Sequence, residues 1–427
     1  MADELAAVVM AAGIGTRMKS ATPKHLHPLL GRRMVDWVVE AARGAGVERL
    51  VVVASPQTAD LLEGVEIVVQ EEPLGTGDAV RRARAALETL DGDVLVLNGD
   101  VPALRPETIR ALVDAHRGAA AAATVLSFEP ANAGAYGRIV RDGDGRLARI
   151  VEAADASPDE LTLREVNSGI YAFRADKLWP ALERLDAHNA QGELYVTDTL
   201  GLLVAEGEPC AVQLADDPLE AEGVNTRAEL ALAAASLRDR INEAHMLAGV
   251  TIVDPASTWI EAGVEIEIDV VVHPYTVIRG GVRIESGAEI GPFAYVRPVS
   301  VIGEGAKVGT FVELKNAAVG SGAKIPHLSY VGDAEVGEGA NVAAGNITAN
   351  FKHAPGEPKA RTKIGRNVRT GVDTVFDAPV EVGDDAWIAA GSVITDDVPP
   401  GSLAGFPPRQ TTKEGWVYEK HGKPDGD

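Results

Sequence analysis

The sequence predicts an α/β protein in two parts. A Rossmann-like domain with a mostly parallel sheet comes first, and a left-handed parallel β-helix follows. In the first half, short apolar strands alternate with amphipathic helix patterns; in the second, an aliphatic residue recurs at every sixth position. The length of 427 residues also requires more than one hydrophobic core.

In the first half, predicted strands and helices alternate as in βαβ units. Apolar strands are predicted at 5–10, 49–54, 66–70 and 93–100, and helices at 34–46 and 77–90. Ligands of such sheets bind beyond the carboxyl ends of the strands. The turn at 11–17 and the turn after Asp100 are expected at that edge.

The second half carries a hexapeptide repeat from about residue 250. Six residues per flat side and three sides per coil would form a triangular prism. After a phase slip the period returns at Ile364, Val382, Ile388 and Ile394. The first uninterrupted run is Ile266, Val272, Ile278, Ile284, Ile290, Val296, Ile302, Val308 and Leu314.

A helical stretch at 225–250 joins the halves, with Leu230, Ala234, Leu237 and Ile241 on one stripe. We therefore expect four segments. They are the first domain at 1–225, a linker helix at 226–249, the β-helix at 250–408 and a polar C-terminal tail at 409–427.

The net charge of −23 argues against nucleic acid or an anionic membrane as the main partner. Cys210 is the single cysteine, which excludes an internal disulfide and suits a reducing compartment. The N-terminus reads as a first strand rather than a signal peptide, and no apolar run is long enough to span a bilayer. We expect a soluble, cytoplasmic protein.

The stretch MAAGIGTRMKSATPKHL, residues 10–26, is basic, in contrast to the acidic composition of the whole chain. It lacks the third glycine of a dinucleotide-binding turn and continues instead into Arg17, and no GK[ST] makes it a P-loop. A turn of backbone N–H groups followed by Arg17 and Lys24 can hold a polyphosphate. Asp100 could supply an oxygen ligand for Mg²⁺. The alternatives are a solvated basic surface and an Asp100 that only caps a helix.

Motifs along the first half of the chain resemble those of a known enzyme family. AAGIGTRM and PKHLHPLLG look like the signature of sugar-1-phosphate nucleotidyltransferases, and seven further motifs follow in order: EEPLGTGDAV, NGDVPAL, AYGRIVR, IVEAADAS, EVNSGIYAF, NAQGELYVTD and EGVNTRAEL. With a hexapeptide β-helix behind them, residues 5–416 are similar to the bacterial bifunctional N-acetylglucosamine-1-phosphate uridylyltransferase/glucosamine-1-phosphate acetyltransferases. That resemblance implies synthesis of UDP-N-acetylglucosamine, a precursor of peptidoglycan and lipopolysaccharide.

The resemblance also implies roles for residues of the first half. Arg17 and Lys24 would grip UTP, and Asp100 with Asn225 would hold Mg²⁺. Gln70 and Thr76 would read the uracil edge. The other residues expected to line the nucleotide pocket are Met10, Ala11, Ala12, Gly13 and Gly75, and those expected to hold N-acetylglucosamine 1-phosphate are Gly137, Glu152, Asn167, Tyr195, Thr197 and Asn225.

In the second half, polar residues interrupt the coil pattern. They are Arg297, Lys315, His327 and Tyr330. Arginine and lysine suit a sugar phosphate, and a histidine can take the proton of an attacking amine. Without further context, His327 is equally one surface histidine among nine.

The resemblance makes His327 the general base of acetyl transfer from acetyl-CoA, in clefts of a homotrimer built through the β-helix. Asn341, Asn350 and Lys359 would contact the substrate together with Arg297, Lys315 and Tyr330. Ala344 and Ala390 would lie along the coenzyme.

Several positions depart from the family pattern. Pro73, Ala153 and Ala154 stand where other residues are usual in the uridylyltransferase half. In the second half, Phe351 replaces a tyrosine, and Lys352-His353 replaces an Asp-Gly pair. The loop is also longer, with Pro355, Gly356 and Pro358, and Arg409 is a weak match for a coenzyme-contacting residue. The coils between Val250 and Arg297 look fewer than usual.

Three alternatives stay open. The β-helix could be a trimerisation scaffold behind a nucleotidyltransferase that has no second activity. The chain could instead be a regulatory subunit, although Arg17, Lys24, Asp100 and Asn225 are all present. A different sugar or nucleotide, such as glucose or dTTP, is the third alternative.

Overall fold

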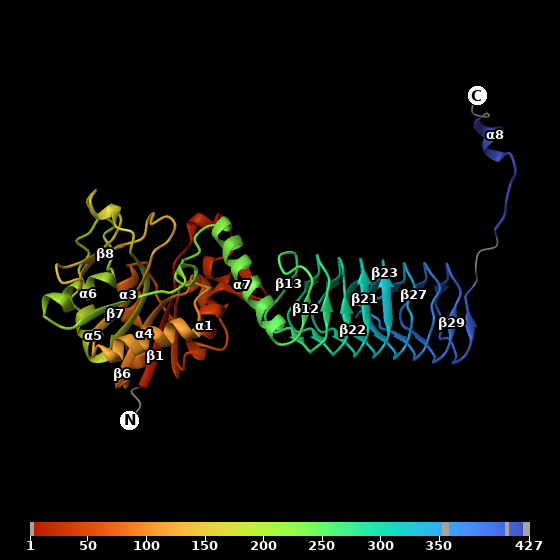
Figure 1. Cartoon of the computed structure of the whole chain (residues 1–427), viewed down its shortest axis with the longest axis horizontal. Coiled ribbons are helices and arrows are strands. Elements are labelled where there is room, and N and C mark those ends of the chain that lie inside the picture. The colour runs from red at the N-terminus through yellow and green to blue at the C-terminus, as the bar shows by residue number, and fades with distance from the viewer. Residues whose placement is uncertain (1–3, 352–357, 406–409, 422–427) are drawn as a thin grey trace. The chain divides into compact units, whose positions relative to one another are not determined.

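The computed structural model describes residues 4–351, 358–405 and 410–421, and it forms two compact units, Met1–Leu237 and Arg238–Asp427 (Figure 1). The division falls inside the helix α7 (Arg227–Leu247). Leu230 of α7 packs against Met18, Met34 and Val224 of the first unit. Ile241 packs against the core of the second.

The first unit is built on a nine-stranded sheet with the main order β11-β7-β10-β6-β1-β4-β5. β1 is parallel to both β4 and β6, and β10 runs antiparallel to β6 and β7. The predicted mostly parallel sheet is therefore present. The strands are β1 (Glu4–Ala11), β4 (Arg49–Ala54), β5 (Glu66–Val69), β6 (Gly92–Asn98), β7 (Ala123–Phe128), β8 (Arg138–Arg141), β9 (Leu147–Val151), β10 (Val166–Arg174) and β11 (Cys210–Leu214), with a small ribbon of β2 (Pro28–Leu29) and β3 (Arg32–Arg33).

Alternate residues of β1 pack into two hydrophobic cores, one on each face of the sheet, because successive side chains of a strand point to opposite faces. Val8 and Met10 join the core covered by α3, α5 and α6, whereas Val9 joins the core covered by α1 and α4. The helices of this unit are α1 (Met34–Gly44), α2 (Pro56–Ala59), α3 (Thr76–Arg82), α4 (Pro106–Gly118), α5 (Ala175–Leu182) and α6 (Thr197–Ala205).

The helix predicted at 77–90 is shorter than its pattern indicates. α3 ends at Arg82, and a single 3₁₀ turn follows at Ala85–Leu87. In that turn, the carbonyl of Ala86 accepts a hydrogen bond from the Arg49 guanidinium. The apolar period continues through this turn because Leu87 and Leu90 are still buried in the core.

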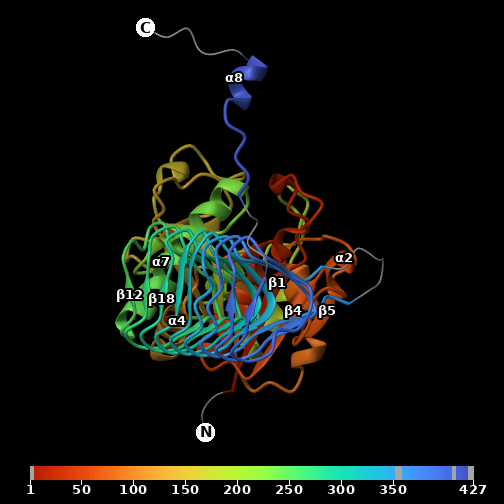
Figure 2. The same ribbon diagram turned by 90° about the vertical axis from the view of Figure 1, so that its right-hand side faces the viewer.

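The second unit is a parallel β-helix whose coils lie one behind another in Figure 2. Strand partners are 18 residues apart, as in the pairs Val272–Ile290 and Ile284–Ile302. Of the nine predicted core positions, the eight from Val272 to Leu314 are 0% exposed, and Ile266 is partly buried against the same core. The hexapeptide prediction is confirmed.

The phase slip also has a structural cause. The coils that contain β22 (Glu313–Val319) and β24 (Tyr330–Val336) each have one side that is one residue shorter than the usual six. Val319 therefore pairs with Val336 at a separation of 17 residues instead of 18. The next coil contains an insertion, because Val336 pairs with Ile364, which is 28 residues further on.

The strands of the second unit are short and numerous. They are β12 (Thr251–Ile252), β13 (Trp259–Ile260), β14 (Glu265–Ile266), β15 (Val271–Val272), β16 (Val277–Ile278), β17 (Arg283–Ile284), β18 (Glu289–Ile290), β19 (Tyr295–Val296), β20 (Val301–Ile302), β21 (Lys307–Thr310), β22, β23 (Lys324–His327), β24, β25 (Ile347–Ala349), β26 (Thr362–Ile364), β27 (Val375–Asp377), β28 (Val380–Val382), β29 (Trp387–Ile388), β30 (Val393–Ile394) and β31 (Leu403–Ala404).

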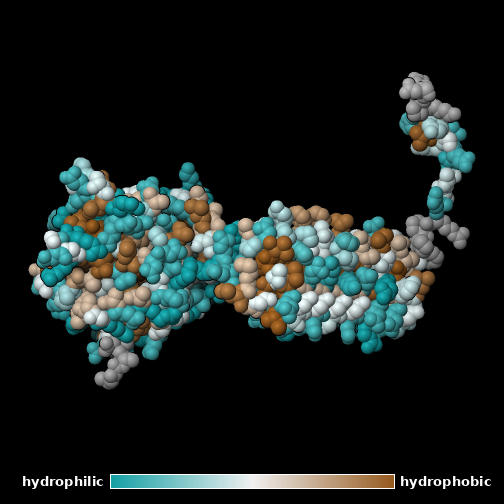
Figure 3. Space-filling view, in the orientation of Figure 1, coloured by the Kyte–Doolittle hydropathy of each residue, from teal (hydrophilic) through white to brown (hydrophobic). Residues whose placement is uncertain are grey.

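Exposed apolar side chains form a ladder along one corner of the prism. The rings of Tyr275, Phe293 and Phe311 stack at centroid distances of 4.9 and 5.0 Å. Leu328 continues the row, because Thr310 pairs with His327 in the next coil. All four residues are exposed and have positive φ. The surface of this unit carries such apolar patches among polar groups (Figure 3).

Beyond the β-helix, the predicted tail contains the short helix α8 (Trp416–His421). Within the ranges that the structure describes, no helix combines the length and the apolar character needed to cross a membrane.

The burial pattern makes a stability prediction for one strand. Ile302→Ala removes a fully buried side chain of β20 and should lower the free energy of unfolding by about 2–5 kcal/mol. Val301→Ala, at the neighbouring exposed position, should change it by less than about 0.5 kcal/mol. Chemical denaturation followed by circular dichroism checks both. Equal effects of the two substitutions would contradict the assigned register.

Candidate functional site

The predicted nucleotide residues meet at the carboxyl edge of the sheet. Met10 at the end of β1 pairs with Asn98 at the end of β6, and Gly99 N–H donates to the Met10 carbonyl at 2.9 Å. The turn that follows β1 therefore lies directly beside Asp100. This is the edge at which parallel sheets bind their ligands.

Two cations and two oxygen donors converge at this edge. Lys24 Nζ contacts an Asp100 carboxylate oxygen and donates to Asn225 Oδ1 at 2.6 Å. Arg17 Nη2 donates to the same Asn225 oxygen at 2.9 Å. Gly15 permits this approach, because a Cβ there would lie 2.4 Å from Lys24 Cβ. Arg17 and Lys24, from one segment, are thus brought together with Asp100 and Asn225 from two distant parts of the first unit.

Asn225 is held in place by the start of α7. Glu229 accepts the backbone N–H groups of Asn225 and Thr226 at 2.6 and 2.9 Å, and Thr226 Oγ1 accepts the Glu229 N–H at 3.2 Å, forming a capping box. Val224 N–H donates to the Asp100 carbonyl at 2.8 Å. Sequence reasoning missed Glu229, although the spacing of Thr226 and Glu229 signals such a cap.

The oxygens of this edge suit a cation. The Asp100 carboxylate and the Asn225 amide oxygen both approach the Lys24 ammonium, so they present converging hard donors of the kind that Mg²⁺ takes. Among the described residues, no group of three or more His, Cys, Asp or Glu side chains could hold a metal ion without other ligands. Such an ion would need further oxygen ligands.

Burial and charge oppose each other at this site. Burial would raise the pKa of Asp100, but the charges of Lys24 and His25 outweigh it and hold that pKa below its ordinary value. His25 is buried beside the same pair. Its desolvation lowers its pKa to about 4, in spite of the attraction of Asp100. His25 is therefore neutral near pH 7.

The turn at Leu74–Gly77 is attached to the segment that carries Tyr195. Leu194 N–H donates to the Leu74 carbonyl at 2.9 Å, and Gly77 N–H donates to the Leu194 carbonyl at 2.7 Å. Thr76 Oγ1 accepts the Val196 N–H at 3.0 Å. The predicted nucleotide turn and the predicted sugar-binding segment are thus joined by main-chain bonds.

Four of the predicted sugar-binding residues are neighbours. Thr197 donates to Glu152 at 3.2 Å, and a Cβ on Gly137 would lie 3.3 Å from the other Glu152 oxygen. Asn167 N–H donates to the Gly137 carbonyl at 2.8 Å. Burial raises the pKa of Glu152. Tyr195 has a buried hydroxyl without a hydrogen-bond partner among the described residues, and burial raises its pKa to about 12.

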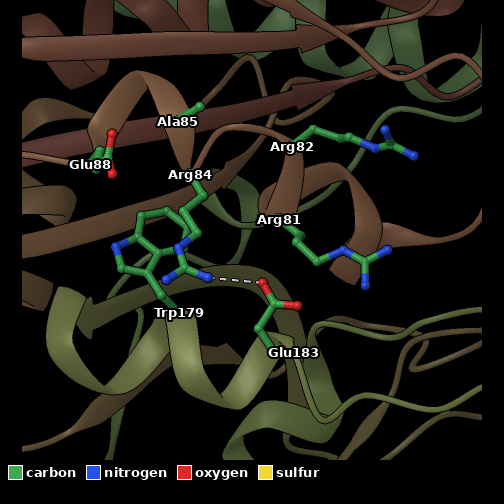
Figure 4. Close-up of a pocket in the computed structure, with 7 residues that line it drawn as sticks. All are labelled: Arg81, Arg82, Arg84, Ala85, Glu88, Trp179 and Glu183. Atoms are coloured by element: carbon green, nitrogen blue, oxygen red, sulfur yellow. Dashed lines mark hydrogen bonds and ion pairs between the residues drawn. The ribbon is translucent and has the colours of Figure 1, made fainter.

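A hollow of about 660 Å³ lies next to α3 (Figure 4). Its arginines are already paired: Arg84 with Glu183 at 2.9 Å, and Arg81 and Arg82 with Asp78 at 2.8 and 3.3 Å. The residues that line it are Arg81, Arg82, Arg84, Ala85, Glu88, Trp179 and Glu183, none of which was predicted to bind the nucleotide.

In the β-helix, predicted substrate residues gather around Asp333. Asn350 Nδ2 contacts this carboxylate, Lys315 Nζ lies 3.8 Å from it, and the Tyr330 hydroxyl is 3.4 Å from Asn350 Nδ2. Lys359 lies close to Lys315, whose side-chain hydrogen bond and positive charge lower the pKa of Lys359. Asp333 was not predicted, since only the coil register brings it next to Asn350.

The remaining predicted residues are spread over adjacent coils. Arg297 N–H donates to the Leu314 carbonyl at 2.8 Å, which places it beside Lys315, and its guanidinium pairs with Glu313 at 3.0 Å. Asn341 lies between Lys324 and Arg369. Of the altered loop, Lys352, His353, Pro355 and Gly356 lie outside the described residues, as does Arg409.

The predicted base and the two predicted coenzyme residues share one row. Lys324 pairs with Asn341 and Tyr330 with Ile347, so His327 lies opposite Ala344. Asp373 N–H bonds to the Ala344 carbonyl at 2.9 Å and Gly391 N–H to the Val372 carbonyl at 2.8 Å. The row His327, Ala344, Val372 and Ala390 therefore runs along successive coils.

Comparisons with known proteins agree with this division of the chain. Residues 7–200 match the family model of the MobA-like NTP transferase domain, and residues 263–298 match that of the bacterial transferase hexapeptide (six repeats).

Curated relatives match over nearly the whole chain, and three that carry the name bifunctional protein GlmU illustrate this. The protein of Corynebacterium aurimucosum is 44% identical over 97% of this chain and 94% of its own length. That of Geobacter metallireducens is 43% identical over 98% and 99%, and that of Streptomyces coelicolor 44% identical over 97% and 94%.

The low pKa of His25 makes stability depend on pH. Because the folded-state pKa of about 4 lies below the ordinary 6.5, the unfolded chain binds more protons between these values, and stability falls as the pH drops from 6.5 towards 4. The loss attributable to His25 is on the order of 3 kcal/mol. Urea unfolding of metal-free protein across this range should show a slope that His25→Gln flattens.

The control for this measurement is His188→Gln, because the His188 side chain is 91% exposed. It should leave the slope unchanged. An identical pH dependence of wild type and His25→Gln would contradict the assigned burial of the imidazole.

Proposed function

Because the chain belongs to the family of bifunctional GlmU proteins, we propose that each of its two units carries the activity predicted for it from the sequence. The chain is a transferase with a nucleotidyltransferase domain and a hexapeptide acyltransferase domain. It acetylates glucosamine 1-phosphate with acetyl-CoA and then transfers UMP from UTP to N-acetylglucosamine 1-phosphate, which makes UDP-N-acetylglucosamine. The convergence of Arg17, Lys24, Asp100 and Asn225 supports this proposal most strongly.

In the uridylyltransferase site, Arg17 and Lys24 bind the triphosphate, and Asp100 with Asn225 holds Mg²⁺. When bound there, the ion supplies positive charge that offsets the charge of the phosphate oxygens. A phosphate oxygen of the sugar attacks the α-phosphorus, a new P–O bond forms, and the bond to the departing pyrophosphate breaks. No covalent enzyme intermediate is needed, since positioning and charge neutralisation suffice.

The sugar is held by Gly137, Glu152, Asn167, Tyr195 and Thr197. The buried, unpartnered hydroxyl of Tyr195 supports this role, since a buried polar group without a partner is costly unless a ligand satisfies it. The main-chain bonds between Leu74–Gly77 and Leu194–Val196 keep this subsite at a fixed distance from the nucleotide turn.

In the acetyltransferase site, His327 takes a proton from the amine of glucosamine 1-phosphate as the nitrogen attacks the thioester carbonyl. A C–N bond forms, the C–S bond breaks, and the coenzyme leaves as a thiolate that takes up a proton. Arg297, Lys315 and Lys359 bind the sugar phosphate. The coenzyme lies along the row that leads from His327 through Ala344 to Ala390.

One observation favours an alternative, in which the β-helix is a scaffold and only uridylyl transfer occurs. The imidazole of His327 is exposed and has no orienting partner among the described residues of this chain. General bases are usually oriented by a third group. In the bifunctional proposal, a neighbouring copy of the chain completes this site.

We therefore include a homotrimer built through the β-helix in the proposal. The exposed ladder of Tyr275, Phe293, Phe311 and Leu328 supports it, because Leu328 directly follows His327 and stacked aromatic groups rarely remain in water. A cytoplasmic location, where UTP and acetyl-CoA are available, is part of the same proposal.

Substitutions at the two sites should separate the two activities. Asp100→Ala removes a metal and charge partner and should lower uridylyl transfer on the order of 10²–10³-fold while acetyl transfer continues. His327→Ala should lower acetyl transfer on the order of 10²–10⁴-fold while uridylyl transfer continues. Pyrophosphate release and free coenzyme A are the readouts.

The control is His273→Ala, in the same β-helix, whose imidazole is already paired with Glu289 at 2.9 Å. It should retain both activities. If purified wild-type protein released pyrophosphate but no coenzyme A, the scaffold alternative would replace the bifunctional proposal.

The ladder makes a prediction about assembly. Phe293→Glu combined with Phe311→Glu places charges in the apolar row and should convert the trimer to monomers, with loss of acetyl transfer and retention of uridylyl transfer. Light scattering coupled to size-exclusion chromatography measures the mass. Val393→Glu, at another exposed apolar position, is the matched control. A wild-type monomer, or a trimer that tolerates both ladder substitutions, would contradict this assignment.

A further inference from the structure

Gln70 presents a constrained amide at the predicted base-binding edge. It follows β5 directly, its backbone N–H donates to the Ala54 carbonyl at 2.9 Å, and its side chain is almost fully buried. A primary amide has two N–H donors and one carbonyl acceptor. If the amide oxygen faces a base, the side chain accepts a hydrogen bond from it. If the amide nitrogen faces the base, the side chain donates one.

Both donors of Gln70 are already directed at protein acceptors. Nε2 donates to the Gly75 carbonyl at 3.1 Å and to Asp78 Oδ2 at 3.0 Å. An ionised carboxylate only accepts hydrogen bonds, so the reversed amide would face it with an oxygen. Within the described residues no hydrogen bond reaches Gln70 Oε1. The side chain can therefore offer a ligand its acceptor end.

Asp78 is fixed as an ionised acceptor by its own neighbours. It is 0% exposed in the first turn of α3, and its carboxylate binds Arg81 at 2.8 Å and Arg82 at 3.3 Å. Burial alone would raise the pKa of Asp78, but the bonds from Gln70 and the two arginines lower it. The carboxylate is therefore charged at neutral pH.

The second acceptor, the Gly75 carbonyl, cannot turn away. Gly75 has a φ of 111°, and a Cβ on it would lie 2.5 Å from the Leu194 carbonyl oxygen and 2.7 Å from the Leu194 nitrogen. This close packing fixes the peptide that faces Gln70. Two independently held acceptors thus select the same orientation of the amide.

We propose that Asp78 is a positioning residue that locks the Gln70 amide with its oxygen offered to the base, and that this orientation selects uracil against cytosine. Uracil carries a donor N3–H that the oxygen accepts. Cytosine has an acceptor at N3, which the same oxygen would repel. This inference rests on the proposed uridylyl transfer and adds the cause of its base preference.

The test compares kcat/KM for UTP and CTP with N-acetylglucosamine 1-phosphate in the full-length protein. Asp78→Asn lets the residue donate as well as accept, so the UTP/CTP ratio should fall about tenfold, which corresponds to about 1.4 kcal/mol. Asp36→Asn is the matched control, because Asp36 lies in the first turn of α1 and pairs with Arg33 at 2.8 Å. It should leave the ratio unchanged.

A double-mutant cycle separates positioning from a structural role. In the Gln70→Ala background, Asp78→Asn should change the UTP/CTP ratio by less than about twofold, because the group that it orients is gone. If Asp78→Asn does not fold, as judged by its thermal transition, Asp78→Ala replaces it with the same expected direction.

An unchanged ratio in folded Asp78→Asn would overturn the proposal. An equal loss for both nucleotides with and without Gln70 would do the same. A wild-type enzyme that uses UTP and CTP equally well would also contradict it and leave uridylyl transfer intact. A wild-type enzyme that uses neither nucleotide would instead contradict the proposed function, and the inference with it.

Discussion

The first unit depends on the convergence of Lys24 and Arg17 with Asp100 and Asn225 at one edge of the sheet. Taking a carboxylate out of water without a partner is costly, so the partly buried Asp100 is stabilised by a cation beside it. Lys24 meets that need in the structure, and the capping box of α7 supplies the second oxygen. In the proposed function, the triphosphate draws the two cations and leaves both oxygens to Mg²⁺.

In the second unit, the repeat determines where polar side chains can lie. Its core takes two residues from most six-residue sides, largely aliphatic residues and alanine, so most charged side chains are left on the faces and corners of the prism. The predicted functional side chains can therefore form rows, because equivalent positions of successive coils lie above one another. His327, Ala344 and Ala390 share such a row, whereas Lys315, Tyr330 and Asn350 gather around Asp333.

The repeat from Ile266 to Leu314 could be predicted position by position, because the same position of each hexapeptide is aliphatic and lies against the core. The end of α3 could not, since the apolar period continues past it in the buried Leu87 and Leu90. Asp78 and Asp333 were missed because their partners depend on a turn and on a coil register. Residue type indicated which groups could bind phosphate, and only the fold brought them together.

In the proposed function, Asp100 and Asn225 make triphosphate binding dependent on Mg²⁺. Calorimetric titration of UTP into the wild-type protein, with and without Mg²⁺, tests it most directly. UTP should bind at least about tenfold more tightly with the ion, and Asp100→Asn should remove most of this difference. Equal UTP affinity with and without Mg²⁺, or an undiminished effect of Mg²⁺ in the variant, would contradict it.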